Sequence, residues 1–333
     1  IIKNYVLKTR RMKKYVIGFD LGGTNSVLAL VDKEGNVSEQ VSFKTNEFPD
    51  IEQYVKQCTK TITELIQKAG GKEYIAALGI GAPDVNYWSR SIENATNLPW
   101  KGIVPLADKI EAKTGIVTFI TNDAKAAALG EMLYGAAQGM KDFIMITLGT
   151  GVGSGIVVNG ELVYGKRSFA GELGHMSIRP ENGRICPCGR IGCLEAYCSA
   201  TGMVRTAIDF LKKSGKESSL HTLPITSITS KDIYDAAMKG DQVAKEIFEY
   251  TGKLLGEALA NCATFSDPEA FILFGGLTKA GSLLLEPTIC TYKKMVFENY
   301  RNTAQIILSG LKEADAAILG AAALAWTKIE KTK

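Results

Sequence analysis

Apolar runs separated by glycine-rich turns divide the N-terminal part of the chain into strands. Tyr15–Asp20 and Ser26–Val31 predict two strands, joined by Leu21–Asn25, whose two glycines are free to adopt positive φ in a tight turn. The same pattern recurs far downstream in three consecutive segments, Phe143–Thr147, Leu148–Gly153 and Ser154–Val158. Two such β-turn-β units, distant in the chain, predict two domains of similar design.

Longer periodic stretches predict helices between these strands. The first half holds a helix over about 50–69, strands at Ala76–Ile80 and Ile116–Ile120, and an alanine-rich helix from Ala124 to about Ala137. The second half holds helices near 200–213 and 231–263, a surface loop over 214–230, and a strand at Ala270–Phe274. A buried helix over Ala314–Trp326 closes the chain and is expected to return to the first domain. Strands alternating with helices predict an α/β fold.

Composition narrows the class of protein. A chain of 333 residues is long enough for about two domains, and 46% apolar with 22% charged residues is ordinary for a globular protein. The net charge of +4, from 39 basic and 35 acidic residues, is too even to indicate nucleic-acid binding. No apolar run is long enough to span a membrane and no export signal stands out, which predicts a cytoplasmic protein with no membrane partner. Residues 1–12 are interpreted as an extension.

One histidine and three cysteines have the composition of a metal site. His175, Cys186, Cys188 and Cys193 fall within nineteen residues, and this set matches a closed zinc site of the Cys3His type. Disulfides or buried thiols are the alternatives, although the Cys-x-Cys pair is too close for an easy mutual bridge. Two acidic residues, Glu172 and Glu195, bracket the cluster. The other cysteines are expected to be reduced core residues: Cys58, Cys198, Cys262 and Cys290.

Three glycine-rich turns are candidates for phosphate binding. Asp20–Asn25 combines a carboxylate, backbone amides and a hydroxyl, so Asp20 could hold Mg²⁺ while the amides approach phosphate oxygens. Gly149–Gly153 offers a second turn, and Gly275–Gly276 a third glycine pair. Each alone is most often a plain hairpin, and none fits the P-loop or Rossmann pattern. Their combination favours nucleotide binding.

Asn122 and Asp123 lie where a predicted strand ends and a helix starts. A helix cap is the plain interpretation. The position also lies at the expected domain junction, where ligands bind in α/β folds and where an aspartate could accept a hydroxyl proton during phosphoryl transfer. The turns Gly81–Pro83 and Asn94–Trp100 could line the same pocket.

Together these pieces resemble the ROK family (repressors, open reading frames and kinases). The resemblance covers the chain from about Lys13, and its most specific motifs are Asp20–Thr24, Leu148–Gly153, Gly171–His175 and Cys186–Glu195. It implies two ribonuclease-H-like α/β domains of the actin–hexokinase type with an interdomain cleft. The small domain would take residues 13–122 and 311–333, and the large domain, with the zinc site, residues 123–310.

The family also implies a role for each matching position. Asp123 would be the catalytic base, and Lys125 stands where the family usually has asparagine. We expect the Lys125 side chain to point to solvent; turned inward, its positive charge would lower the pKa of the base. The sugar ligands would be Gly81, Asn97, Asn122, Asp123, Glu172, His175 and Glu195. The ATP phosphates and Mg²⁺ would be bound by Asp20, Gly22, Gly23, Thr24, Gly149, Thr150 and Gly151, and the adenosine by Gly275 and Gly276. Zinc would be held by His175, Cys186, Cys188 and Cys193.

The resemblance predicts an ATP-dependent hexose 6-kinase that acts on D-glucose. Alternatives within the family are kinases of N-acetylmannosamine, N-acetylglucosamine, fructose or allose. A sugar-responsive repressor is the rival class, but only nineteen residues precede Asp20, too few for a helix-turn-helix domain. The family suggests a homodimer or homotetramer.

Overall fold

The computed structural model describes residues 13–213 and 215–331, and these form two compact units. The first unit comprises the residues up to Gly139, the segment Leu162–Ala170 and the residues from Gly310 onward. The second comprises Met140–Glu161 and Gly171–Ser309. The expected extension at residues 1–12 lies outside the described residues.

Helix α4 (Asp123–Tyr134) belongs to the first unit, although the predicted domain division places it in the second. It packs on the closing helix α10 (Ala316–Lys331), and the two backbones meet at a pair of glycines. A Cβ on Gly130 would lie 3.1 Å from Gly320 Cα, and one on Gly320 would lie 2.6 Å from the backbone of Ala126. The division into functional domains itself stays a prediction.

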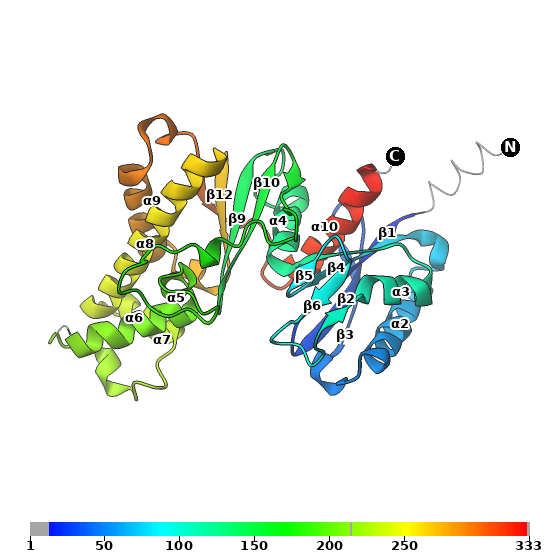
Figure 1. Cartoon of the computed structure of the whole chain (residues 1–333), viewed down its shortest axis with the longest axis horizontal. Helices are drawn as coiled ribbons and strands as arrows, with labels where there is room; N and C mark the ends of the chain where they lie inside the picture. Colours follow the sequence, from blue (N-terminus) through cyan, green and yellow to red (C-terminus); the bar gives the residue numbers. More distant parts are fainter. Residues whose placement is uncertain (1–12, 214, 332–333) are drawn as a thin grey trace. The chain divides into compact units, whose positions relative to one another are not determined.

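The first unit is built on a five-stranded sheet of order β3-β2-β1-β4-β8 (Figure 1). β1 pairs antiparallel with β2 and parallel with β4, which pairs parallel with β8. The strands are β1 (Tyr15–Leu21), β2 (Asn25–Val31), β3 (Val37–Lys44), β4 (Ile75–Ala82) and β8 (Thr118–Asn122). The predicted strands are therefore confirmed, with β8 beginning later than expected. A small second sheet contains β5 (Val85–Asn86), β6 (Ser91–Glu93) and β7 (Ile103–Val104).

The two faces of this sheet carry different side chains because successive strand residues point to opposite sides. Ile17 and Phe19 belong to the core that also contains residues of α2 (Ile51–Lys68) and α3 (Leu106–Thr114). The residue between them, Gly18, faces α10, and a Cβ there would lie 2.6 Å from Ile318 O. The alanine-rich closing helix thus packs on the first unit, as the sequence predicts, because glycines let its backbone come close.

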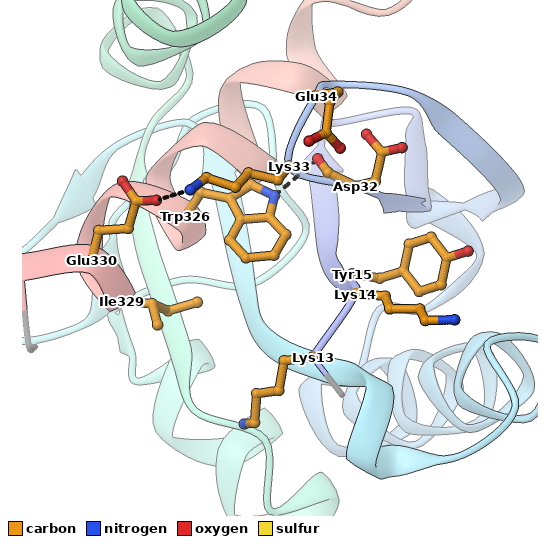
Figure 2. A pocket seen from close by; sticks show the side chains of 9 residues that line it. All are labelled: Lys13, Lys14, Tyr15, Asp32, Lys33, Glu34, Trp326, Ile329 and Glu330. Atoms are coloured by element: carbon orange, nitrogen blue, oxygen red, sulfur yellow. Dashed lines mark hydrogen bonds and ion pairs between the residues drawn. The ribbon is translucent and has the colours of Figure 1, made fainter. Parts of the chain in front are cut away.

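The C-terminal part of α10 is attached to the turn between β2 and β3 (Figure 2). Trp326 Nε1 donates a hydrogen bond of 3.0 Å to Asp32 O, and Lys33 forms an ion pair of 2.8 Å with Glu330. These residues border a pocket of about 460 Å³ that Lys13 and Lys14 also line. The contacts fix the end of the helix on the sheet.

The second unit repeats the arrangement with a sheet of order β11-β10-β9-β12-β13. β9 and β10 form an antiparallel hairpin, while β12 runs parallel to β9 and β13. The strands are β9 (Phe143–Leu148), β10 (Val152–Val158), β11 (Glu161–Leu162), β12 (Ala270–Phe274) and β13 (Gln305–Leu308). Leu162, the last residue of β11, is grouped with the first unit. The helices are α5 (Glu195–Cys198), α6 (Ala200–Lys213), α7 (Ser230–Met238), α8 (Gln242–Ser266) and α9 (Ser282–Met295). The α/β fold with two units of similar design is confirmed.

The sequence pattern did not predict β3, β13, α3 or α9, and two further details differ from its predictions. The helical stretch 231–263 is two helices, because Gly240 adopts φ +97° and Asp241 caps α8 by accepting from Ala244 N at 3.0 Å. Cys290 is exposed on α9, so its assignment to the core is wrong, whereas Cys58, Cys198 and Cys262 are buried as expected. Among the described helices, none combines the length and apolar character needed to cross a membrane.

Candidate functional site

In the first unit, polar residues collect at the carboxyl ends of three parallel strands. The register sets Asp20 beside Gly81, and Ala82 beside Asn122, so the ends of β1, β4 and β8 lie at one edge of the sheet. Burial of Asp20, and then the negative charge of Asp123, raise the pKa of Asp20 from 3.8 to about 6. Two carboxylates that interact in this way form a site where a cation or an acidic proton is stabilised.

The turn after Asp20 packs directly on the loop that contains Asn97. Gly22 N donates to Asn25 O at 2.9 Å and closes the hairpin. A Cβ on Gly23 would lie only 2.4 Å from Asn97 O. Thr24 is exposed beside it. The structure therefore brings Gly22, Gly23 and Asn97 together, and it leaves Asn97 exposed.

Asn122 and Asp123 begin α4. Asn122 Oδ1 accepts from Ala124 N at 3.0 Å, which is the capping bond, and Asp123 Oδ1 accepts from the same amide at 2.7 Å. Asp123 is exposed and Asn122 half-buried. Lys125 is only 1% exposed, so the expectation that it points to solvent is wrong. Every residue from Ala124 to Glu131 is buried, which leaves this part of the helix without a solvent face.

In the second unit, the turn between β9 and β10 contacts Glu195 at the start of α5. Glu195 Oε2 accepts from Val152 N at 2.9 Å, and a Cβ on Gly151 would lie 2.5 Å from the same oxygen. Thr150 O accepts from Thr201 Oγ1 at 3.0 Å, while Gly149 O accepts from Ala200 N at 2.8 Å. The glycine turn, one carboxylate and the start of α6 thus form one cluster.

Glu172 and His175 lie on a short 3₁₀ turn that packs against β10. His175 N donates to Glu172 O at 3.1 Å. A Cβ on Gly174 would lie 2.1 Å from Val152 O, which shows how close this turn comes to the strand. Glu172 is exposed and His175 half-buried.

The predicted metal ligands converge. Among the described residues, one ligand atom each from His175, Cys186, Cys188 and Cys193 lies within 4.8 Å of the others. The Sγ atoms of Cys188 and Cys193 are 3.7 Å apart, and Cys186 Sγ is 3.8 Å from His175 Nδ1. Two sulfurs bound at about 2.3 Å in a tetrahedron lie roughly 3.8 Å apart, so these separations fit zinc. The carboxylate of Glu195 is joined to the cluster through Cys186 Sγ, at 3.6 Å from Oε1.

The third glycine pair borders a pocket of the second unit. Gly275 adopts φ +107°, and a Cβ there would lie 2.6 Å from Leu148 O, so only glycine fits this close approach to β9. Gly276 lines a pocket of about 380 Å³ with Tyr234 and Phe248. Sequence reasoning missed the contribution of α7 to this pocket because no motif marks Tyr234.

Comparison with known proteins identifies the family. The ROK family model matches residues 16–328. The chain belongs to the ROK family. It is 34% identical over 319 residues to a glucokinase of Halalkalibacterium halodurans, covering 92% of this chain and 93% of that one. A ROK family glucokinase of Streptomyces griseus, solved with glucose and AMPPNP, is similar with a TM-score of 0.74 and 34% identity, covering 94% of this chain and 99% of that one.

ROK proteins also include repressors, and one of these is similar too. An N-acetylglucosamine repressor of Escherichia coli O157:H7 is 31% identical over 219 residues. That match covers 66% of this chain and 52% of the repressor. The glucokinase match therefore covers a larger share both of this chain and of the matched protein than the repressor match does.

Proposed function

We propose that this ROK chain is a glucokinase, which transfers the γ-phosphoryl group of ATP to the 6-hydroxyl of D-glucose. The observation that carries the proposal is the exposed carboxylate of Asp123 beside the half-buried Asp20, at the carboxyl ends of β1, β4 and β8. Nearly full-length similarity to glucokinases supports the choice of substrate.

In this proposal Asp123 is the general base. Its carboxylate accepts the proton of the sugar 6-hydroxyl while the hydroxyl oxygen bonds to the γ-phosphorus. The bond from that phosphorus to the β–γ bridging oxygen breaks, and ADP leaves with the electron pair. The start of α4 suits this role because the Asn122 cap and the amide of Ala124 fix the backbone and one carboxylate oxygen.

Charge on the transferred group would be stabilised by Mg²⁺ and by backbone amides. Asp20 would hold Mg²⁺ directly or through water, and the cation would offset the cost of ionising a carboxylate that burial disfavours. The bare turns at Gly22–Thr24 and Gly149–Gly151 would bind the ATP phosphates. The adenosine would lie against Gly275 and Gly276, where the pocket with Tyr234 and Phe248 offers aromatic and apolar surface.

Sugar hydroxyls would be recognised by acidic and polar groups of the chain. Glu195 is held by the amide of Val152, and Glu172 and His175 lie on the tightly packed 3₁₀ turn. Gly81, Asn97 and Asn122 would complete the set. A site of this kind discriminates strongly because an analogue without a matching hydroxyl leaves buried polar groups unpaired.

Zinc would be held by His175, Cys186, Cys188 and Cys193, whose separations fit its tetrahedral geometry. The metal would supply structure and leave the chemistry to other groups. Because His175 is a ligand and Glu195 lies 3.6 Å from Cys186 Sγ, the cluster would brace two sugar ligands at once.

The test is Asp123→Asn, with glucose-dependent ADP formation and glucose binding measured on the same preparation. Loss of the base should lower kcat by about 10²–10⁴-fold while the glucose Kd stays within about twofold. Asp50→Asn is a matched control, since Asp50 also stands at a helix start in the first unit and asparagine caps equally well. Near-normal turnover of the Asp123 variant would reject the assignment.

A repressor is the second candidate function, favoured by the similarity to the Escherichia coli protein. Gel shifts with genomic fragments, with and without sugar, test it, and a specific complex would support it. The expected homodimer or homotetramer stays a prediction that sedimentation velocity can measure. The expected cytoplasmic location also stays a prediction.

A further inference from the structure

One short segment of the chain belongs to a different unit from its neighbours in sequence. Leu162–Ala170 is part of the first unit, although the residues before and after it are part of the second. Tyr164 of this segment is only 8% exposed, and its ring stacks on that of Tyr87 with centroids 3.9 Å apart and planes at 16°. We call Leu162–Ala170 the strap.

Hydrogen bonds and a cation add to this stack. Trp88 Nε1 donates to Gly165 O at 2.8 Å, and Tyr87 N donates to Ser168 Oγ at 3.0 Å. Lys328 Nζ lies 4.7 Å from the Tyr87 centroid and 5.8 Å from that of Tyr164. The strap also closes on itself, because Ala170 N donates to Tyr164 O at 3.1 Å. It is therefore a fixed loop on the first unit.

The chain is fixed to the second unit immediately afterwards. Ser154 Oγ donates to Gly171 O and accepts from Leu173 N at 3.1 Å, and Ser154 is buried. Gly171 adopts φ +87°, a conformation that favours glycine at this crossing point. Glu172 and His175 follow directly. Since two residues of extended chain span at most about 7 Å, Glu172 cannot move far from the end of the strap.

We propose that Tyr87, Trp88 and Tyr164, the aromatic clasp, are positioning residues for sugar binding. By holding the strap, the clasp restricts the segment that carries Glu172 and His175, so less conformational freedom is lost when sugar binds. The proposal rests on the proposed function only for the assignment of sugar binding to these two residues.

The kinetic test compares two tryptophan variants. Trp88→Phe removes an indole N–H that binds a backbone carbonyl in the first unit while keeping an aromatic ring. Trp326→Phe makes the same chemical change in the same unit, at the 3.0 Å bond to Asp32 O (Figure 2), which is a hydrogen bond that does not involve the strap. We expect Trp88→Phe to raise the glucose KM about threefold or more, and Tyr164→Leu to raise it further. KM for ATP and kcat should stay within about twofold, and Trp326→Phe should change none of the three. Equal changes of the glucose KM in Trp88→Phe and Trp326→Phe would reject the proposal that the aromatic clasp positions the sugar ligands.

A second measurement needs no substrate. Hydrogen exchange of the amides of Leu173, His175 and Met176, which all donate hydrogen bonds, should accelerate in Trp88→Phe and not in Trp326→Phe. Unchanged exchange rates in Trp88→Phe would reject the proposal that the aromatic clasp restricts this segment, whatever the kinetic results are. If the unmodified protein neither binds nor phosphorylates glucose, the proposed function fails, and the exchange rates still decide whether the clasp holds the segment.

Discussion

At the scale of single residues, glycines matter to the site because they leave room for the side chains of other residues. Gly151 leaves room for Glu195 Oε2, which a Cβ would meet at 2.5 Å, whereas a Cβ on Gly149 in the same turn would meet nothing within 4 Å. Substitution of Gly151 by alanine should therefore crowd the carboxylate of Glu195, whereas the same substitution of Gly149 should not.

Gly151→Ala should raise the glucose KM by about tenfold, because overpacking costs about 1–3 kcal/mol and pushes Glu195 off the Val152 amide. Gly149→Ala should leave the glucose KM unchanged and alter only the KM for ATP. Steady-state kinetics with each substrate varied will separate the two effects. An unchanged glucose KM in Gly151→Ala would contradict the steric argument.

Asp20 should make stability depend on pH. Its pKa in the folded protein is raised from 3.8 to about 6, so between these values the folded protein binds the proton more tightly than the unfolded chain does. The free energy of unfolding therefore falls as pH rises through this window. Asp20→Asn lacks the buried charge, and we expect it to be more stable than the unmodified protein at neutral pH and to lose activity.

The measurement is the thermal midpoint of the ligand-free protein against pH. The difference in thermal midpoint between Asp20→Asn and the unmodified protein should become smaller as the pH falls through about 6, because Asp20 then becomes neutral in the folded protein. A variant that is less stable than the unmodified protein at neutral pH would contradict this explanation.

At the scale of elements, the Cys and His cluster links several short segments that have little regular structure. Little helix or strand structure is present in the segments Glu172–Met176 and Cys186–Cys193. These segments, which precede α5, bring four candidate ligand atoms within 4.8 Å of one another. Such segments depend on a metal to hold them, since ligand binding contributes directly to folding free energy.

Removing zinc with a chelator should weaken glucose affinity as well as lower the thermal midpoint. Cys188→Ser should act in the same way, whereas Cys290→Ser, at the exposed cysteine outside the cluster, is the matched control. Zinc content per chain, glucose Kd by calorimetry and circular dichroism will be compared. If the metal-free protein stays folded and binds glucose unchanged, the zinc does not brace the sugar ligands.

At the scale of the whole molecule, two sheets with the same order of strands carry different functional groups. The first unit supplies the paired carboxylates Asp20 and Asp123, and the second supplies the cluster of His175 and three cysteines, with Glu172 and Glu195. The shared design positions a glycine turn at the first hairpin of each sheet. Substrate choice then depends on the loops that follow the strands.

A panel of hexoses tests that choice. We expect the highest kcat/KM with D-glucose, and lower values with fructose, allose, N-acetylmannosamine and N-acetylglucosamine, measured by coupled ADP formation. The difference should lie mainly in KM for close analogues, because hydroxyl contacts bind the ground state as well as the transition state. A preference for an N-acetylated sugar would reject glucose as the substrate while keeping the kinase class.

The sequence by itself determined the hairpins β1–β2 and β9–β10, the strands β4, β8 and β12, and the grouping of His175 with three cysteines, because each depends on a pattern within a short stretch of chain. It did not predict the edge strands β3 and β13. It could not determine which side of an alanine-rich helix is covered: every residue from Ala124 to Glu131 of α4 is buried, so Lys125 is buried against expectation. Only the tertiary structure decided that Cys290 is exposed, that α4 packs with the first unit, and that the strap belongs to the first unit. These features arise from contacts between residues far apart in the chain, such as Tyr87 with Tyr164, or α4 with α10, which local pattern does not encode.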